Sequence, residues 1–187
     1  MTILSFKNQL LIAMPSLQDG YFDQSVAIIC EHNEQGALGI VINKNTPDIT
    51  LLDVLEQSQV AIPPMMSPHE MVYLGGPVQP EQGFVLHTPI GEWSSSLRVS
   101  DELALTTSRD ILANLGTQLA PQHFLVAVGY AGWGAGQLER EIAENYWLTA
   151  EVSLDILFTI PPLVKRSAAV ASLGITLDQL IAGCGHA

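Results

Sequence analysis

Short apolar segments rich in β-branched residues, separated by turn signals, dominate the first two thirds of this sequence and constrain its fold more than any other feature. Residues 25–31 and 37–43 are two such segments, and the polar stretch 31–36 between them predicts a β-hairpin. The other predicted strands share this composition and cover residues 9–14, 71–74, 84–87, 97–99, 103–106, 123–130 and 147–151. The chain is therefore expected to build its core around a β-sheet.

The last third of the sequence has helical signals instead. Helices are predicted over 153–159 and 161–172, with a short final helix that begins after Thr176. Earlier helices are expected over 51–57, after 107–110 and over 135–146, where the last follows a glycine-rich turn at 131–136. Strands first and helices last predict an α+β fold, in which helices flank a strongly coiled, mostly antiparallel sheet. No repeat or linker interrupts residues 1–187, so one compact domain is expected.

The charge balance argues against polyanionic partners. Lys and Arg number 7 against 19 Asp and Glu, which gives a net charge of −12. Nucleic-acid affinity depends on several basic groups that neutralise phosphates, and only Lys165 and Arg166 are adjacent here. Direct binding of nucleic acid or of an anionic membrane is therefore not expected. Only 14% of the residues are charged, which leaves apolar surface for self-association into a homo-oligomer or for a protein partner.

The expected compartment is the cytoplasm. The apolar runs fall far short of the roughly 20 residues that span a bilayer, and the apolar patch near the start is too short for a signal peptide. Two cysteines, Cys30 and Cys184, do not make a disulfide scaffold and suit a reducing environment.

The glycine-rich segment from Gly129 to Gly136 carries the nearest likeness to a nucleotide site. It follows a predicted strand and precedes a predicted helix, as a dinucleotide-binding loop does. However, Gln137 stands where the third glycine belongs, and Glu139 and Glu141 would repel a pyrophosphate at the helix N-terminus. The segment is interpreted first as a sharp turn that lets Trp133 cover the core, with nucleotide binding as the alternative.

Glu139 is the most informative carboxylate in the sequence. On the predicted helix it borders the apolar face formed by Leu138, Ile142 and Tyr146. As a functional group it would be a general acid or a ligand contact, with His32 or His87 as its proton-transfer partner. As a structural group it would accept hydrogen bonds from loop backbone amides, and this second interpretation is favoured.

No metal, cofactor or catalytic nucleophile is predicted. Glu31, His32 and Glu34 carry suitable ligand atoms, but their spacing places them on a turn rather than on one rigid face. The serines at 94–96 lack a glycine elbow, and Cys30 lies within a strand pattern. No catalytic residue is assigned.

Taken together, the motifs resemble the AlgH/YqgE family of bacterial proteins along essentially the whole chain. The matching stretches include Met14-Pro15, Glu31-His32, residues 36–43, residues 74–78 and residues 129–141. The resemblance implies a compact, cytoplasmic α+β domain with a coiled, bifurcated sheet. The family has been labelled a transcriptional regulator, but no activity, cofactor or catalytic residue is attached to it, so none is carried over.

The leading hypothesis is a non-catalytic regulator or adaptor that binds a protein or a small ligand. Its predicted binding surface joins the hairpin tip to the glycine-rich segment and consists of Glu31, His32, Trp133, Gln137 and Glu139. One alternative is a nucleotide- or small-molecule-binding enzyme that uses residues 129–136 and Glu139. The other is a transcriptional regulator that acts without direct DNA binding.

Overall fold

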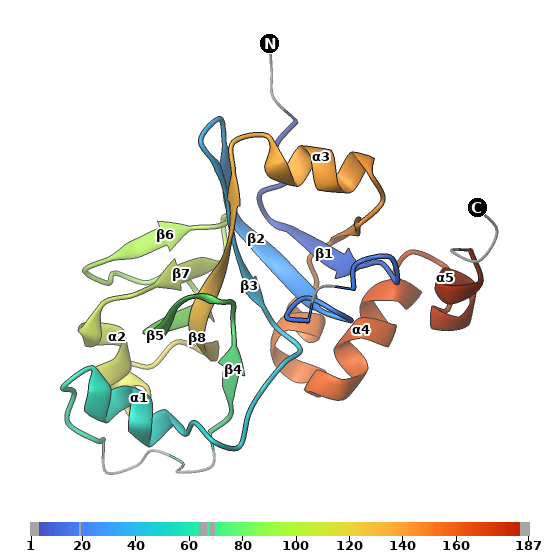
Figure 1. Ribbon diagram of the computed structural model, residues 1–187. Coiled ribbons are helices and arrows are strands. Elements are labelled where there is room, and N and C mark those ends of the chain that lie inside the picture. The colour runs from blue at the N-terminus through green and yellow to red at the C-terminus, as the bar shows by residue number, and fades with distance from the viewer. Residues whose placement is uncertain (1–3, 19, 64–66, 68–69, 184–187) are drawn as a thin grey trace.

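Nine strands form a single curled sheet in the computed structural model, which describes residues 4–183 except 19, 64–66 and 68–69. The strands are β1 (Gln9–Ala13), β2 (Val26–Asn33), β3 (Gly36–Val41), β4 (Val72–Leu74), β5 (Val78–Thr88), β6 (Ser96–Arg98), β7 (Ala104–Thr106), β8 (His123–Gly134) and β9 (Trp147–Glu151). Their spatial order is β6-β7-β5-β8-β3-β2-β1-β9, and β4 adds to β8 as the parallel neighbour (Figure 1). The remaining pairings are antiparallel.

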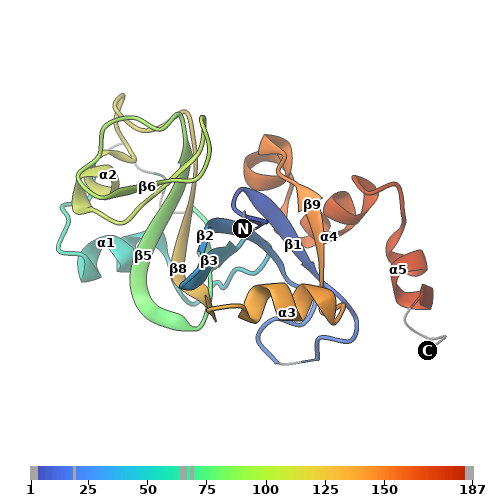
Figure 2. The same ribbon diagram turned by 90° about the horizontal axis from the view of Figure 1, so that it is seen from above.

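The sheet branches at β8. The first part of β8 lies between β5 and β4, whereas its last part pairs with β3 through Leu38↔Gly132 and Gly36↔Gly134. Gly129 lies at the change of partner with a φ of +73°, a conformation that favours glycine. Gly75 connects β8 and β3 at this branch, because its N–H donates to the Val128 carbonyl (2.9 Å) and its carbonyl accepts from the Val41 N–H (2.8 Å). The two wings of the sheet consequently curl apart, as Figure 2 shows from above.

The helices cover both wings and define three apolar clusters. Helices α1 (Leu51–Gln57) and α2 (Arg109–Asn114) pack on the wing of β4, β5 and β8. On the other wing α3 (Gln137–Ala143) covers one face of β1 and β2, and the opposite face carries a π-helix (Asp155–Thr159) and α4 (Pro162–Ala171). Helix α5 (Leu177–Gly183) follows beside α4. Within the described part of the chain, no helix is long and apolar enough to cross a bilayer.

Most predicted elements are confirmed, and the main correction concerns the glycine-rich segment. The predicted turn over 131–136 is wrong because β8 continues to Gly134, and the helix that follows covers 137–143 rather than 135–146. Glycines on the facing strand permit this pairing: a Cβ on Gly36 would lie 2.1 Å from the Trp133 carbonyl oxygen. Strand β5 is also longer than predicted, since its exposed start at Val78 joins the ladder through a bulge before Gly83.

A buried lysine completes the backbone hydrogen bonding of the π-helix. The carbonyl of Leu157 would normally accept a bond from a residue one turn later, but Pro161 and Pro162 have no N–H to give. The Lys165 ammonium takes their place, with its Nζ 2.6 Å from the Leu157 oxygen and 4.8 Å from the centroid of the Tyr73 ring. Lys165 is only 1% exposed, and burial lowers the pKa of its ammonium to about 8.

This pKa predicts a stability that increases above neutral pH. Between about pH 8 and pH 10 the unfolded chain binds more protons at Lys165 than the folded chain, so the free energy of unfolding should rise with pH. A rise of about 2 kcal/mol is expected, at about 1.4 kcal/mol per pH unit of difference. Urea unfolding across this range measures it. Lys165→Met should flatten the rise, and parallel pH profiles for the two proteins would contradict the assignment.

Candidate functional site

The structure brings the hairpin tip and the glycine-rich segment together at one end of the sheet. The hairpin between β2 and β3 ends in the pairs His32↔Ala37 and Asn33↔Gly36, and β3 carries the end of β8 on its other side. Helix α3 then crosses beside these strands (Figure 2). The five predicted surface residues therefore gather in one region, but they divide into three separate sets of contacts.

Neighbouring residues on β2 face opposite sides of the sheet, which separates Glu31 from His32. Glu31 forms an ion pair with Lys7, with its Oε2 3.0 Å from the lysine Nζ. His32 lies on the side of α3, where its Nε2 is 3.0 Å from Oε1 of Glu139. The hairpin tip thus does not gather a metal-ligand set, and no group of three or more His, Cys, Asp or Glu suited to a metal was found among the described residues.

His32 is a fully engaged structural histidine. Its side chain is completely buried, and Nδ1 lies 3.0 Å from the backbone nitrogen of Phe6. A backbone N–H can only donate, so Nδ1 is the acceptor and the proton of the neutral ring is on Nε2, which donates to Glu139. Glu139 thus accepts a hydrogen bond, as the favoured interpretation expects. However, the predicted donor is wrong, because it is the His32 side chain rather than a loop backbone amide.

Glu141 is the residue that sequence reasoning missed. Its Oε2 accepts hydrogen bonds from the indole N–H groups of both Trp133 and Trp147, each at 2.9 Å. Its Oε1 accepts from the Gln137 amide at 2.9 Å, and the Gln137 carbonyl oxygen accepts from the Gly134 N–H at the same distance. One carboxylate therefore holds two tryptophans and the start of α3 in place. The amide of Gln137 is engaged within the protein on both its nitrogen and its oxygen.

Two signals in the sequence could have located this carboxylate. Glu141 lies four residues after Gln137, so the two side chains share one face of a helix. Buried tryptophans also require an acceptor for their indole N–H. The expected turn over 131–136 placed Trp133 on the core but did not indicate that its indole N–H points to the following helix.

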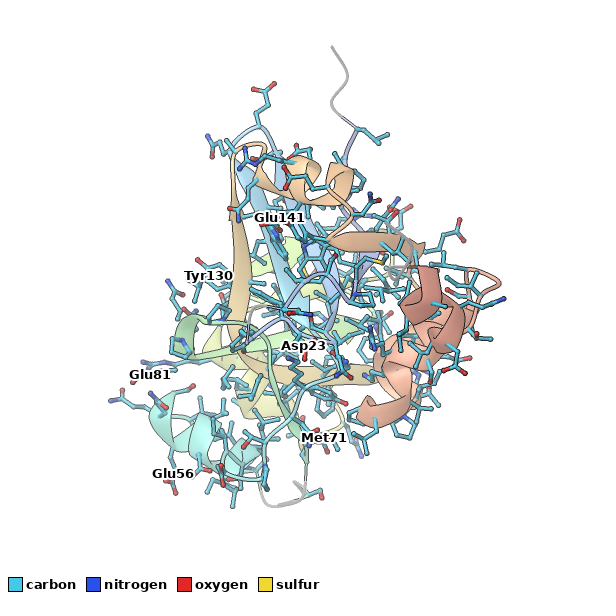
Figure 3. The ribbon with its side chains drawn as sticks, turned by 45° about the vertical axis from the view of Figure 1, so that its right-hand side comes forward. Asp23, Glu56, Met71, Glu81, Tyr130 and Glu141 are labelled. Atoms are coloured by element: carbon cyan, nitrogen blue, oxygen red, sulfur yellow. The ribbon has the colours of Figure 1, made fainter. Side chains whose placement is uncertain are left out.

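An open groove lies on the side of β8 that carries Tyr130, opposite the side that carries Glu141. Its volume is about 550 Å³. The residues that line it come from the hairpin, β8 and the starts of β5 and β6: Glu31, Asn33, Gln35, Gly36, Ala37, Leu38, Val78, Leu97, Tyr130, Gly132 and Trp133. Figure 3 shows Tyr130 and Glu141 on opposite sides of β8. The lining thus combines apolar residues of β3, β5, β6 and β8 with polar side chains of the hairpin tip.

The backbone of β8 offers hydrogen-bonding groups to this groove. In an antiparallel ladder the N–H and C=O of one residue point to the same neighbour, and alternate residues share that direction. The Gly134 N–H donates to Gln137 and hence points away from β3, so the peptide groups of Gly132 also point away from β3. On that side the ladder with β5 ends at Val78↔Tyr130, and no described residue of β5 pairs with Gly132.

Other reactive side chains of the sequence lie away from this region. His87 is buried on β5, where its Nδ1 contacts the Pro89 carbonyl (2.9 Å) and its Nε2 the Thr106 hydroxyl (2.7 Å). Burial lowers the pKa of the His87 ring. Of the two histidines considered as partners of Glu139, the structure therefore brings only His32 to it. Burial raises the pKa of the Cys30 thiol to about 12, which suppresses the reactive thiolate.

Fold and site together define an α+β protein with a curled, half-barrel sheet and a groove beside its branch point. The family model described as AlgH-like matches residues 10–178, and the chain belongs to this family. The resemblance inferred from the motifs and the expected fold class are therefore confirmed.

Individual relatives agree over nearly their full length. UPF0301 proteins from Thioalkalivibrio sulfidiphilus and Neisseria meningitidis are 54% and 48% identical to this chain over 183 and 184 residues. These alignments cover 98% of this chain and 97% and 100% of the two relatives. The solution structure of the AlgH protein from Pseudomonas aeruginosa is similar with a TM-score of 0.82 and 45% identity, covering 100% of this chain and 98% of that one. A Corynebacterium diphtheriae protein shares the fold with a TM-score of 0.71 at 19% identity, over 95% and 91% of the two chains.

Proposed function

We propose that this protein is a non-catalytic cytoplasmic regulator or adaptor that binds an extended segment of a partner protein in the groove beside β8. The observation that carries the proposal is the position of Gly132, which lines the groove and whose peptide groups point away from β3, beyond the last β5 pair. An extended peptide can add to such an edge as a further strand, with main-chain hydrogen bonds that give affinity. Gly132 has no side chain to obstruct this approach.

The lining of the groove supports a segment with alternating apolar side chains. Leu38, Val78 and Tyr130 are apolar members of the lining, and successive side chains of an added strand point alternately toward and away from such a surface. Val78 is 36% exposed, so its burial by a ligand would contribute to binding.

The charge of the protein supports a basic partner segment. The net charge of −12 attracts cations over the whole molecule, although Glu31 in the groove lining is already paired with Lys7. Asn33 and Gln35 add carbonyl acceptors to the same lining. A basic, extended segment is therefore favoured over an acidic one, and any regulation of transcription would pass through this protein contact rather than through DNA.

The state of the candidate catalytic groups supports a non-catalytic role. Both ring nitrogens of His32 are engaged in hydrogen bonds, one of them to Oε1 of Glu139, so the ring has no nitrogen left for a substrate. The glycine-rich segment is a paired strand, so its backbone does not form the phosphate loop of the nucleotide-binding alternative.

A designed peptide tests the proposal. A peptide of alternating lysine and valine is labelled for fluorescence anisotropy, and a peptide of the same composition with its valines clustered at one end is the control. Val78→Ser should weaken the alternating peptide about tenfold, the equivalent of roughly 1.4 kcal/mol of lost apolar burial. Val164→Ser is the matched control on α4, because Val164 is 47% exposed and lies outside the groove lining, and it should change nothing.

Three outcomes would contradict this function. One is equal affinity for the alternating and the clustered peptide, which would indicate nonspecific attraction to an acidic protein. Another is equal affinity of wild-type protein and Val78→Ser. A third is self-association that Val78→Ser abolishes in analytical ultracentrifugation, because the occupant would then be a second copy of this chain.

A further inference from the structure

A second cavity lies between the loop that follows β1 and the C-terminal helices, distinct in its lining from the groove beside β8. Its volume is about 530 Å³, which is within the range of small-molecule sites. The lining consists of Pro15, Gln18, Gly20, Asp23, Gln24, Arg166 and Ile181. It contains one cation and one anion, and its other described members are neutral.

Arg166 is held at one end of its guanidinium group and has donors to spare. Nη2 donates to the backbone carbonyl of Ala13 at 3.3 Å, and Nε is buried without a partner among the described residues. A guanidinium has five N–H donors, and most of those of Arg166 have no partner among the residues that the structure describes. Burial lowers the pKa of Arg166, which means that its charge has lost hydration that an anionic ligand could replace.

Asp23 is the anionic member of the lining, and its charge acts on Arg166. The carboxylate partly offsets the effect of burial on the guanidinium. However, the ion pairs found among the described residues do not join these two groups. Asp23 belongs to the loop between β1 and β2, whereas Arg166 belongs to α4 (Asp23 is labelled in Figure 3). Opposite charges thus line the same cavity without a direct ion pair between them.

We infer that this cavity binds a small zwitterion of the α-amino acid type, with its carboxylate on Arg166 and its ammonium on Asp23. A carboxylate matches the fork of a guanidinium and can accept two parallel hydrogen bonds from it. The amides of Gln18 and Gln24 can donate and accept at either end of the ligand, and Ile181, 55% exposed, offers an apolar surface for an aliphatic side chain. A dianion such as phosphate is disfavoured by Asp23 and by the net charge of −12.

Three matched ligands measure the carboxylate contact with Arg166 and the ammonium contact with Asp23 separately. L-valine carries both charges, N-acetylvaline only the carboxylate, and valine amide only the ammonium. Binding is followed by NMR through the backbone amide of Gln24 and the methyl groups of Ile181, up to roughly 20 mM ligand, which covers weak affinities. L-valine should bind at least about tenfold more tightly than either single-charge analogue, since each analogue lacks one charged hydrogen bond.

Two variants test the assignment of the residues. Asp23→Asn should weaken L-valine about tenfold while N-acetylvaline binds at least as well as to the wild type, because the repelling carboxylate is gone. Arg166→Lys keeps the charge but not the fork and should weaken both carboxylate ligands. Val78→Ser, in the groove beside β8, should leave L-valine binding unchanged. A failure of the amino-acid site can therefore be distinguished from a failure of the proposed peptide-binding function.

The inference is overturned if L-valine leaves the Gln24 and Ile181 signals unmoved over the whole range. It is also overturned if L-valine and N-acetylvaline bind the wild type equally well, or if Asp23→Asn affects the two ligands alike. Circular dichroism of both variants must match the wild type, and Asp23, an exposed loop residue, keeps the test independent of any folding defect in Arg166→Lys.

Discussion

Glu141→Ala is expected to lower the free energy of unfolding by about 2–4 kcal/mol, because two buried tryptophans lose the acceptor of their indole N–H groups. Alanine removes the acceptor of both indole N–H groups and of the Gln137 amide in a single change. Trp133 and Trp147 are 6% and 2% exposed, so their indole N–H groups depend on an acceptor within the protein. Urea unfolding monitored by tryptophan fluorescence measures the loss.

Two further variants separate the network from the general effect of removing a carboxylate. Glu144→Ala, at the end of the same helix and exposed, should change stability by no more than about 0.5 kcal/mol. Glu141→Gln keeps one oxygen for the two indoles but places an amide N–H₂ toward the Gln137 donor, so an intermediate loss is expected. A Glu141→Ala protein as stable as Glu144→Ala would show that the network contributes nothing.

Gly76→Ala is expected to destabilise the protein by at least about 3 kcal/mol and to leave much of it unfolded. A Cβ at position 76 would lie 1.9 Å from the carbonyl carbon of Tyr130, 2.0 Å from its oxygen and 2.3 Å from the Ala131 nitrogen. All three atoms belong to the backbone of β8 at its branch, so no side chain can rotate to relieve the contact. Circular dichroism and urea unfolding report the result.

Gly132→Ala is the matched control for this change. The nearest atom to a Cβ at position 132 is a ring carbon of Tyr130 at 3.5 Å, an ordinary contact. The control should stay within about 1 kcal/mol of the wild type. Equal stability of the two alanine variants would mean that β8 and the 75–77 segment are not as closely packed as described.

Local sequence patterns were sufficient for most of the strands and helices. The segments around residues 9–13 and 26–33 are apolar and β-branched with clear ends, and the Thr50–Asp53 capping box marks the start of α1. These signals depend only on near neighbours along the chain. The long β8 did not have such a signal at its end, because glycines at 132, 134 and 136 resemble a turn until the facing strand is known.

The proximity of the two predicted segments could be predicted from the sequence but the contacts within them could not, and their role as a binding surface stays a prediction. The sequence indicated that the hairpin tip and the glycine-rich segment belong together, and β3–β8 pairing places them side by side. The alternation that separates Glu31 from His32 is local to β2, whereas the partner of His32 lies 107 positions further along the chain, at Glu139. The cluster at Glu141 likewise needs the direction of Trp133, which only the extended β8 determines.

The branching of the sheet also has a consequence for the order of events during synthesis. Strands β3, β4 and β5 are all made before β8, yet each of them borders β8 in the finished protein. When only the first 120 residues have been synthesised, β3, β4 and β5 therefore each have an unpaired edge, because the strand that they share is still missing. Chain growth past Gly134 is therefore the first point at which the whole of β8 is available to cover these edges.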